Sequence, residues 1–390
     1  MLRKLKTFTL RVIAGANIAS ILLLLLVGYS DCLNPADYPK LANIGLVFPV
    51  ILIVNIGFLV FWLIFKPKWS LIAIAGLLLA YSPIRTYLPL NISKTAPDDA
   101  LKVISFNAYN KNKADNFNDI IIDYLCQEQA DIVCLQEYIL KGSDDSARVK
   151  AAYPYTDSLS ALTGGDVLSI FSRYPIIRKE FVPNNYELYG LPADPERPKE
   201  ANTHRSVAFF LAIGGDTVCV INNHLESTKL SEQQRTEFKK IVKGDLERDS
   251  ARQESRLLID RLGESSANRA PQAEALAHYL DSILASRQSQ ADGQPAASGP
   301  LGRFPVILCG DFNDGPISYA HRTIAARLTD CYRESANGPG FSYNQYGFFV
   351  RIDNIMCSDD WTPFECKTDR KIVVSDHYPV ICKLKKQVKP

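Results

Sequence analysis

The feature that most restricts how this 390-residue chain can fold is the stretch Phe304–Gly315, which reads FPVILCGDFNDG. Its four consecutive apolar residues, 306–309, are typical of a short buried strand. Asp311 and Asn313 follow directly, so this strand presents a carboxylate and an amide at one point. Such groups suit a divalent cation or a phosphate. They could equally form an ordinary Asp-Asn-Gly turn, and the stretch alone leaves both interpretations open.

Other apolar runs in the chain end in the same way. Each finishes on a residue that can bind a metal or a phosphate: Asn107, Glu137, His224, Asp353 and the pair Asp376–His377. Singly, each of these residues has a structural explanation, such as capping a turn, pairing with a surface arginine or accepting a buried hydrogen bond. Strand ends at one edge of a sheet lie close in space, so distant parts of the sequence can converge there. The recurrence therefore predicts one shared site.

Residues 98–390 predict a single mixed α/β domain in which many short strands alternate with helices. Two segments interrupt this rhythm. Apolar residues recur at helical spacing across 229–285, which predicts a helical insertion. Residues 286–302 are polar and rich in Pro and Gly, which predicts a flexible linker.

Residues 1–97 have a different composition and predict a membrane anchor. Apolar runs at 12–29, 43–65 and 69–88 predict about three transmembrane helices. The first run follows several basic residues and could instead be a cleaved signal peptide. The third run is of marginal length for a span.

The distribution of basic residues predicts the orientation of this anchor. Residues 1–97 contain nine Lys and Arg but only two acidic residues. Because lysines favour the cytoplasmic side, the N-terminus and the Lys66–Lys68 connector are expected inside. Three spans then place residues 98–390 on the periplasmic side of the inner (plasma) membrane, if the source is a Gram-negative bacterium. A cleaved first run gives the same answer, whereas a third run that does not span reverses it.

Six short motifs occur in order along the soluble part: SFN at Ser105–Asn107, LQE at Leu135–Glu137, NNHLES at Asn222–Ser227, GDFND at Gly310–Asp314, RIDNI at Arg351–Ile355 and SDHYP at Ser375–Pro379. In these motifs and their spacing, residues 101–385 resemble the endonuclease/exonuclease/phosphatase superfamily. The resemblance implies a deoxyribonuclease I-like fold, a four-layer αββα sandwich, here preceded by transmembrane helices. It also implies Mg²⁺-dependent hydrolysis of phosphodiester or phosphomonoester bonds, with Mn²⁺ as a possible substitute.

The same resemblance implies which residues bind the metal and the substrate. Glu137 corresponds to the principal Mg²⁺ ligand, with Asn107 and Asp376 near the metal. Asn313 corresponds to a residue that holds a phosphate oxygen. Arg205 stands where the family often has an arginine that reaches the site, although a surface arginine is nearly as good an explanation.

The resemblance also implies the catalytic residues. Asp311 corresponds to the group that orients or deprotonates the attacking water. His377, oriented by Asp353, and His224 correspond to donors that stabilise the negative charge of the transition state. This division matches the chemistry, because phosphoester hydrolysis needs an activated water, a cation and donors for the developing charge.

The sequence does not name the substrate. Residues 98–390 carry a net charge of about −5, which argues against a broad nucleic-acid-binding surface. We therefore place lipid or small-molecule phosphoesters ahead of DNA or RNA, with the bilayer as the other expected partner. A nuclease is the alternative, and a catalytically inactive phosphate-binding module is a third hypothesis. The sequence identifies no protein partner.

Overall fold

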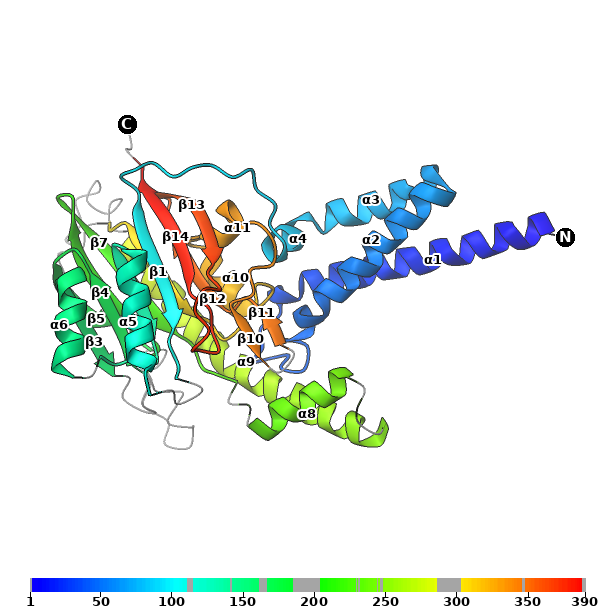
Figure 1. The fold of residues 1–390 in the computed structure, drawn as a ribbon. Helices are drawn as coiled ribbons and strands as arrows, with labels where there is room; N and C mark the ends of the chain where they lie inside the picture. The colour runs from blue at the N-terminus through cyan, green and yellow to red at the C-terminus, as the bar shows by residue number, and fades with distance from the viewer. Residues whose placement is uncertain are drawn as a thin grey trace.

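The computed structural model describes residues 2–110, 115–140, 142–160, 167–184, 204–228, 230, 232–243, 245, 248–285, 303–345 and 348–387. The predicted linker 286–302 lies outside these residues. Figure 1 shows a sandwich of strands and helices from which long N-terminal helices project.

Two six-stranded sheets form the centre of the sandwich. The first contains, in spatial order, β13 (Trp361–Thr368), β14 (Val380–Lys386), β1 (Leu101–Asn107), β2 (Ile132–Gln136), β4 (Val167–Ser172) and β3 (Tyr155–Ser160). The second contains β5 (Ile176–Phe181), β6 (Ser206–Ile213), β7 (Asp216–His224), β8 (Val306–Asp311), β12 (Asp353–Cys357) and β9 (Thr329–Asp330). A separate hairpin pairs β10 (Tyr343–Gln345) with β11 (Phe348–Val350).

The side chains between the two sheets form the central core. Val103 and Ile170 from the first sheet pack in one cluster with Phe209 and Ile307 from the second. This is the face-to-face packing expected of two sheets that each turn one apolar face inward.

Helices cover the two outer faces. α5 (Phe117–Glu128) and α6 (Ser143–Ala152) pack on the first sheet, whereas α9 (Arg248–Leu284) and α10 (Tyr319–Ala325) pack on the second. The four layers confirm the predicted αββα sandwich. The short helix α11 (Cys331–Ser335) lies between β9 and the hairpin.

α9 and its partner α8 (Glu232–Lys243) fall within the segment predicted to be a helical insertion. The C-terminal part of α9 contributes Ala273, Leu276 and Leu280 to the core beneath the second sheet. Its N-terminal part runs beyond the sheet and lies beside α8 (Figure 1).

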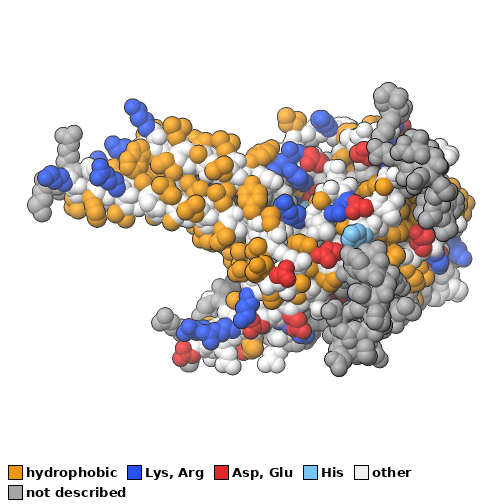
Figure 2. Space-filling model, turned by 180° about the vertical axis from the view of Figure 1, so that it is seen from behind, with side chains coloured by type: hydrophobic (Ala, Val, Ile, Leu, Met, Phe, Trp, Pro, Cys, Tyr) orange, Lys and Arg blue, Asp and Glu red, His pale blue; other side chains and the backbone are white. Residues whose placement is uncertain are grey.

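The N-terminal region is a bundle of apolar helices: α1 (Leu2–Gly28), α2 (Phe48–Phe65), α3 (Ser70–Leu79) and α4 (Tyr81–Tyr87). Two segments are long and apolar enough to cross a membrane, Lys4–Cys32 and Ile44–Phe65. A third span exists only if α3 and α4, which are bent by 65°, are counted as one. Orange apolar side chains cover this bundle in Figure 2, as expected for a surface that faces lipid.

The bundle is docked against the catalytic domain. Ile317 of the domain packs among Leu24, Val27 and Phe48 of the bundle. The backbones approach so closely that a Cβ at Gly45 would lie 2.4 Å from the carbonyl oxygen of Ile317. These contacts fix the bundle against this part of the domain. Within the bundle, the helices are connected by 3-10 turns at Ser30–Cys32 (η1), Ile44–Val47 (η2) and Pro67–Trp69 (η3).

Candidate active site

Strand register places three of the predicted residues in one row. β7 pairs in parallel with β8 so that His224 lies opposite Asp311. β12 pairs antiparallel with β8 so that Asp353 lies opposite Asp311 on the other side. Asp311 is therefore flanked by a histidine and a carboxylate from its two neighbouring strands.

A glycine allows β8 to carry Asp311 this close to β7. Gly310 has φ 154°, and a Cβ there would lie 2.0 Å from the carbonyl oxygen of Asn223. After Asp311 the chain turns, with Asn313 in the left-handed region at φ 50°. The backbone N–H of Asn313 donates to Asp311 Oδ1 at 2.7 Å, so the turn fixes one carboxylate oxygen and leaves Oδ2 facing the site.

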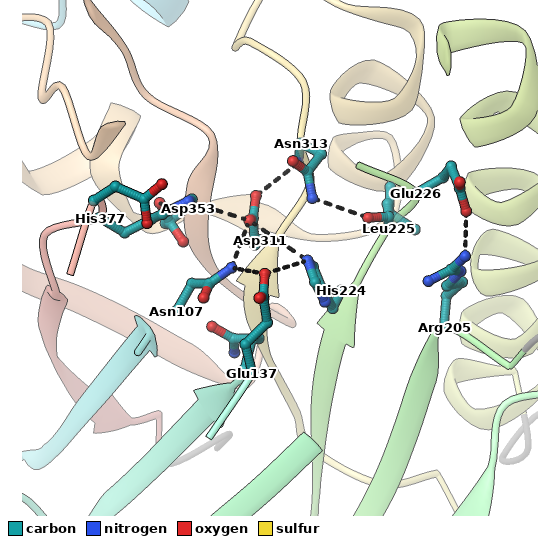
Figure 3. A network of polar contacts seen from close by, with 12 residues as sticks. Asn107, Glu137, Arg205, His224, Leu225, Glu226, Asp311, Asn313, Asp353 and His377 are labelled. Carbon is teal, nitrogen blue, oxygen red and sulfur yellow. Dashed lines mark hydrogen bonds and ion pairs between the residues drawn. The ribbon is translucent and has the colours of Figure 1, made fainter. Parts of the chain in front are cut away.

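The other sheet supplies Asn107 and Glu137. Asn107 Nδ2 donates to Asp311 Oδ2 and to Glu137 Oε1, each at 3.1 Å (Figure 3). Glu137 follows β2 with φ 58°, a conformation that costs a non-glycine residue energy and is common at functional sites. A buried bond from Gln136 Nε2 to Asn222 Oδ1, 2.6 Å long, joins the two sheets just beneath the site.

Both predicted histidines reach Asp311. The Nε2 atoms of His224 and His377 each lie 3.8 Å from Asp311 Oδ2. His224 Nε2 also lies 3.6 Å from Glu137 Oε1. The other ring nitrogen of His377, Nδ1, lies 2.8 Å from Asp353 Oδ2, which fixes the ring so that Nε2 faces Asp311.

Burial and these charges shift two pKa values. Burial, reinforced by the charge of Asp353, raises the pKa of Asp311 to about 6, although the two histidines oppose the shift. Burial disfavours the charged form of His377, but the carboxylates of Asp353 and Asp311 outweigh it and raise its pKa to about 10. The site thus pairs a carboxyl group of raised pKa with an imidazolium.

Several oxygen atoms of the site fit a hard divalent cation. Among the described residues, the buried Oδ1 atoms of Asn107 and Asp376 have no hydrogen-bond partner. The side chain of Glu137 is 29% exposed and lines the same cleft. Asp311, Asp353 and His377 also bring ligand atoms within 4.8 Å of one another. Because Asp353 is engaged with His377, the oxygens around Asn107 and Glu137 are the better fit for a metal.

The site opens into a cavity of about 410 Å³, which we call the cleft. It is lined by these polar residues: Asn43, Tyr109, Glu137, Ser227, Thr228, Arg235, Arg269, Asp311, Asn313, Asp314, Tyr343, Asp376 and His377. Apolar residues line it as well: Leu46, Leu230, Leu262, Phe348, Val350 and Ile352. Asn43 and Leu46 come from the N-terminal bundle, so the cleft combines both parts of the chain.

Arg205 is not where the resemblance implies. It is buried, its Nη2 pairs with Glu226 Oε2, and it does not line the cleft (Figure 3). The sequence alone does not predict this buried ion pair, because nothing in the sequence distinguishes Glu226 from an exposed acidic residue near a strand end.

Two cations of the cleft, Arg235 and Arg269, were missed by the sequence analysis. Arg235 Nη1 lies 3.9 Å from Asp376 Oδ2. Arg269 is buried, with Nε 3.2 Å from Asp314 Oδ2. A signal for Arg269 was present, because it lies four residues before Ala273 on the apolar face of the predicted helix, where a charge needs a buried partner.

The fold and the site define a phosphoester-hydrolase type of α/β sandwich, and the sequence comparison agrees. The profile of the Endonuclease/Exonuclease/phosphatase family matches residues 104–377, and the chain belongs to that family. Residues 10–87 match a second family, described as a domain of unknown function (DUF8431). No curated protein matches the sequence.

Solved structures with a similar fold share little sequence with this chain. The human Nocturnin catalytic domain with bound sulfate is 15% identical, with a TM-score of 0.48 over 74% of this chain and 95% of that one. A Bacteroides thetaiotaomicron mannosyl-6-phosphatase is 17% identical, with a TM-score of 0.45 over 73% and 99%. An AP endonuclease from Archaeoglobus fulgidus is 18% identical, with a TM-score of 0.43 over 72% and 98%.

Proposed function

We propose that this protein is a membrane-anchored, Mg²⁺-dependent phosphoesterase that hydrolyses phosphodiester or phosphomonoester bonds by attack of a water molecule. The observation that carries the proposal is the position of Asp311 Oδ2, 3.8 Å from both His224 Nε2 and His377 Nε2. These gaps are too long for direct hydrogen bonds, and they leave room for a reacting oxygen to contact the groups around it.

In this proposal Asp311 accepts the proton of the attacking water. The backbone N–H of Asn313 holds Oδ1 at 2.7 Å, and Oδ2 accepts from Asn107 Nδ2 with capacity left for a proton from the water. His377, protonated and held by Asp353, and His224 donate to phosphoryl oxygens as negative charge develops. Donors fixed before the reaction in a buried site stabilise that charge without reorganisation.

Glu137, Asn107 and Asp376 would hold the Mg²⁺, and Mn²⁺ could replace it. When bound, the cation would polarise a phosphoryl oxygen and offset the charge of the transition state. The buried, unpaired Oδ1 atoms of Asn107 and Asp376 support this assignment, since oxygen is the ligand that such hard cations prefer.

The remaining substrate contacts come from Asn313 and the two arginines of the cleft. Asn313 Nδ2 donates to the carbonyl oxygen of Leu225 at 3.0 Å, which holds the amide at the cleft wall. Arg235 and Arg269 supply positive charge for one phosphate group. We assign Arg205 a positioning role instead, through its buried pair with Glu226.

A metal-dependence experiment tests this function. Full-length protein in detergent micelles should hydrolyse bis(p-nitrophenyl) phosphate or p-nitrophenyl phosphate with Mg²⁺ and lose this activity on chelation. The Glu137→Gln variant should lose turnover and bind Mn²⁺ more weakly by electron paramagnetic resonance.

Glu128→Gln is the matched control for Glu137→Gln. Glu128 undergoes the same substitution, and its partners Lys102 and Lys371 lie outside the cleft. Turnover that survives chelation, or equal Mn²⁺ binding by Glu137→Gln and the wild type, would contradict the assignment.

A further inference from the structure

The cleft is lined by polar and apolar side chains. Glu137, Asp311 and His377 belong to its polar lining, which we call the polar floor. We call its apolar lining residues the apolar side: Leu46, Leu230, Leu262, Phe348, Val350 and Ile352. A phosphoester that is polar at both ends needs no such wall, because exposed apolar surface costs free energy unless an apolar group covers it.

The apolar side is continuous with the membrane-facing helices. Leu46 lies in η2, two residues before α2 begins at Phe48, and the second candidate span starts at Ile44. Leu46, Val47 and Val50 are exposed apolar residues along this path from the cleft onto α2. A bilayer that surrounds α2 would therefore reach the mouth of the cleft.

Contacts on both sides fix this arrangement. The loop before η2 packs on α9 so closely that a Cβ at Gly263 would lie 2.5 Å from the carbonyl oxygen of Pro39. Ser266 Oγ donates to Asn43 Oδ1 at 3.2 Å, one residue before η2. Asn43 and Leu46, which we call the membrane-proximal wall of the cleft, are therefore held in place by packing on α9.

Aromatic residues extend the apolar side of the cleft. Phe348 of β11 stacks on Phe238 of α8, with ring centroids 3.8 Å apart. The next residue, Phe349, is 51% exposed. These rings add apolar surface beside the cleft that a hydrocarbon chain could cover.

The charges of the cleft suit one phosphate better than a polyanion. Besides His377, the basic residues within the described lining are Arg235 and Arg269, and both are near carboxylates. Tight nucleic-acid binding instead uses many Lys and Arg contacts along the backbone. The described cleft offers no row of cations that a second or third phosphate could follow.

From these observations, we propose that the substrate is a membrane lipid with a phosphoester headgroup. Its phosphate lies at the polar floor, and its hydrocarbon chain leaves along Leu46 and Leu230 toward the bilayer around α2. The proposal rests on the phosphoesterase function above and specifies the substrate class of that site.

Inhibition by phosphatidic acids of two chain lengths tests the proposal without knowledge of the headgroup. Full-length protein in detergent micelles hydrolyses bis(p-nitrophenyl) phosphate while dioleoyl or dibutyryl phosphatidic acid is added. We expect the dioleoyl lipid to inhibit at a concentration at least about tenfold lower, because its chains gain apolar contacts in the cleft.

Two variants separate binding in the cleft from simple partitioning into micelles. Leu46→Asn should weaken inhibition by the dioleoyl lipid about tenfold and change inhibition by the dibutyryl lipid much less. Leu41→Asn changes another exposed leucine, five positions before Leu46, that does not line the cleft, and it should change neither value.

Equal inhibition by the two lipids, or equal effects of Leu46→Asn and Leu41→Asn, would overturn the lipid proposal. Faster digestion of duplex DNA than of any lipid or soluble diester would also overturn it, in favour of a nuclease. The absence of metal-dependent hydrolysis of the soluble diester would instead refute the phosphoesterase function itself.

Discussion

Two buried histidine–aspartate pairs in the described part of the chain are close enough to hydrogen-bond, and they differ in where the second ring nitrogen points. His377 and Asp353 are joined at 2.8 Å, and His321 and Asp330 at 3.2 Å. The His377 ring presents its second nitrogen to Asp311 in the cleft. The His321 pair does not line the cleft, and Asp330 caps α11 instead. Burial and pairing with an aspartate therefore do not identify a catalytic histidine. The direction of the second ring nitrogen, toward Asp311, distinguishes His377.

This contrast supplies a mutational test. Asp353→Asn should lower kcat on bis(p-nitrophenyl) phosphate about 100-fold, because His377 loses the carboxylate that orients it and keeps it protonated. Asp330→Asn alters the other pair and should lower the melting temperature with kcat nearly unchanged. A variant Asp353→Asn that is folded and as active as wild type would contradict the role of the pair.

The sequence predicted which strand-end residues would lie together better than it predicted which side chains would pair with one another. Asn107, Glu137, Asp311 and His377 meet as the strand-end pattern implied. The pairing of Arg205 with Glu226 could not be predicted, because a side chain's direction depends on backbone turns that leave no periodic pattern.

At the scale of the elements, α1, α2 and the turn before α3 pack together at the end of the bundle away from the catalytic domain. Trp69, next to Lys68, packs in one cluster with Leu10, next to Arg11. The apolar part of α1 from there to Gly28 is about 27 Å long at about 1.5 Å per residue, close to the thickness of a bilayer core. At the other end, Tyr29 Oη donates to the carbonyl oxygen of Leu79 at 2.8 Å, so α3 returns to the domain side.

The proposed topology follows from this arrangement of basic residues. If Lys66 and Lys68 lie in the cytoplasm and α3 with α4 crosses the membrane, the catalytic domain would lie on the periplasmic side in a Gram-negative bacterium. A cytoplasm-dependent fluorescent protein fused after Pro390 should give no signal in a Gram-negative host, whereas periplasm-dependent alkaline phosphatase at the same position should be active. The reverse pattern would show that α3 and α4 do not cross.

The sequence predicted the elements better than their long-range contacts. Alternating strands and apolar helical runs are local patterns, and they predicted a mixed α/β domain and apolar N-terminal helices. The αββα sandwich was implied by the resemblance to the family. The docking of residues 39–46 on α9 joins segments more than 200 positions apart, and no local pattern encodes it. This is why the membrane-proximal wall of the cleft emerged only from the structure.

In the molecule as a whole, the anchor and the catalytic domain act as one unit. Arg85 Nη2 pairs with Glu334 Oε2 at 2.6 Å, and Arg351 Nη2 donates to the carbonyl oxygen of Thr86 at 2.6 Å. Together with Ile317 in the bundle core, these contacts hold the cleft beside the start of α2. These contacts therefore fix the position of the site relative to the N-terminal helices.

The central claim is that Asp311 activates water in a metal-dependent phosphoesterase, and the kcat of Asp311→Asn tests it most directly. The full-length variant and wild type are compared on bis(p-nitrophenyl) phosphate with saturating Mg²⁺, after equal melting temperatures have confirmed folding. We predict a kcat about 100- to 10,000-fold lower with little change in KM, because the lost group acts mainly in the transition state. A kcat within about threefold of wild type would contradict the account.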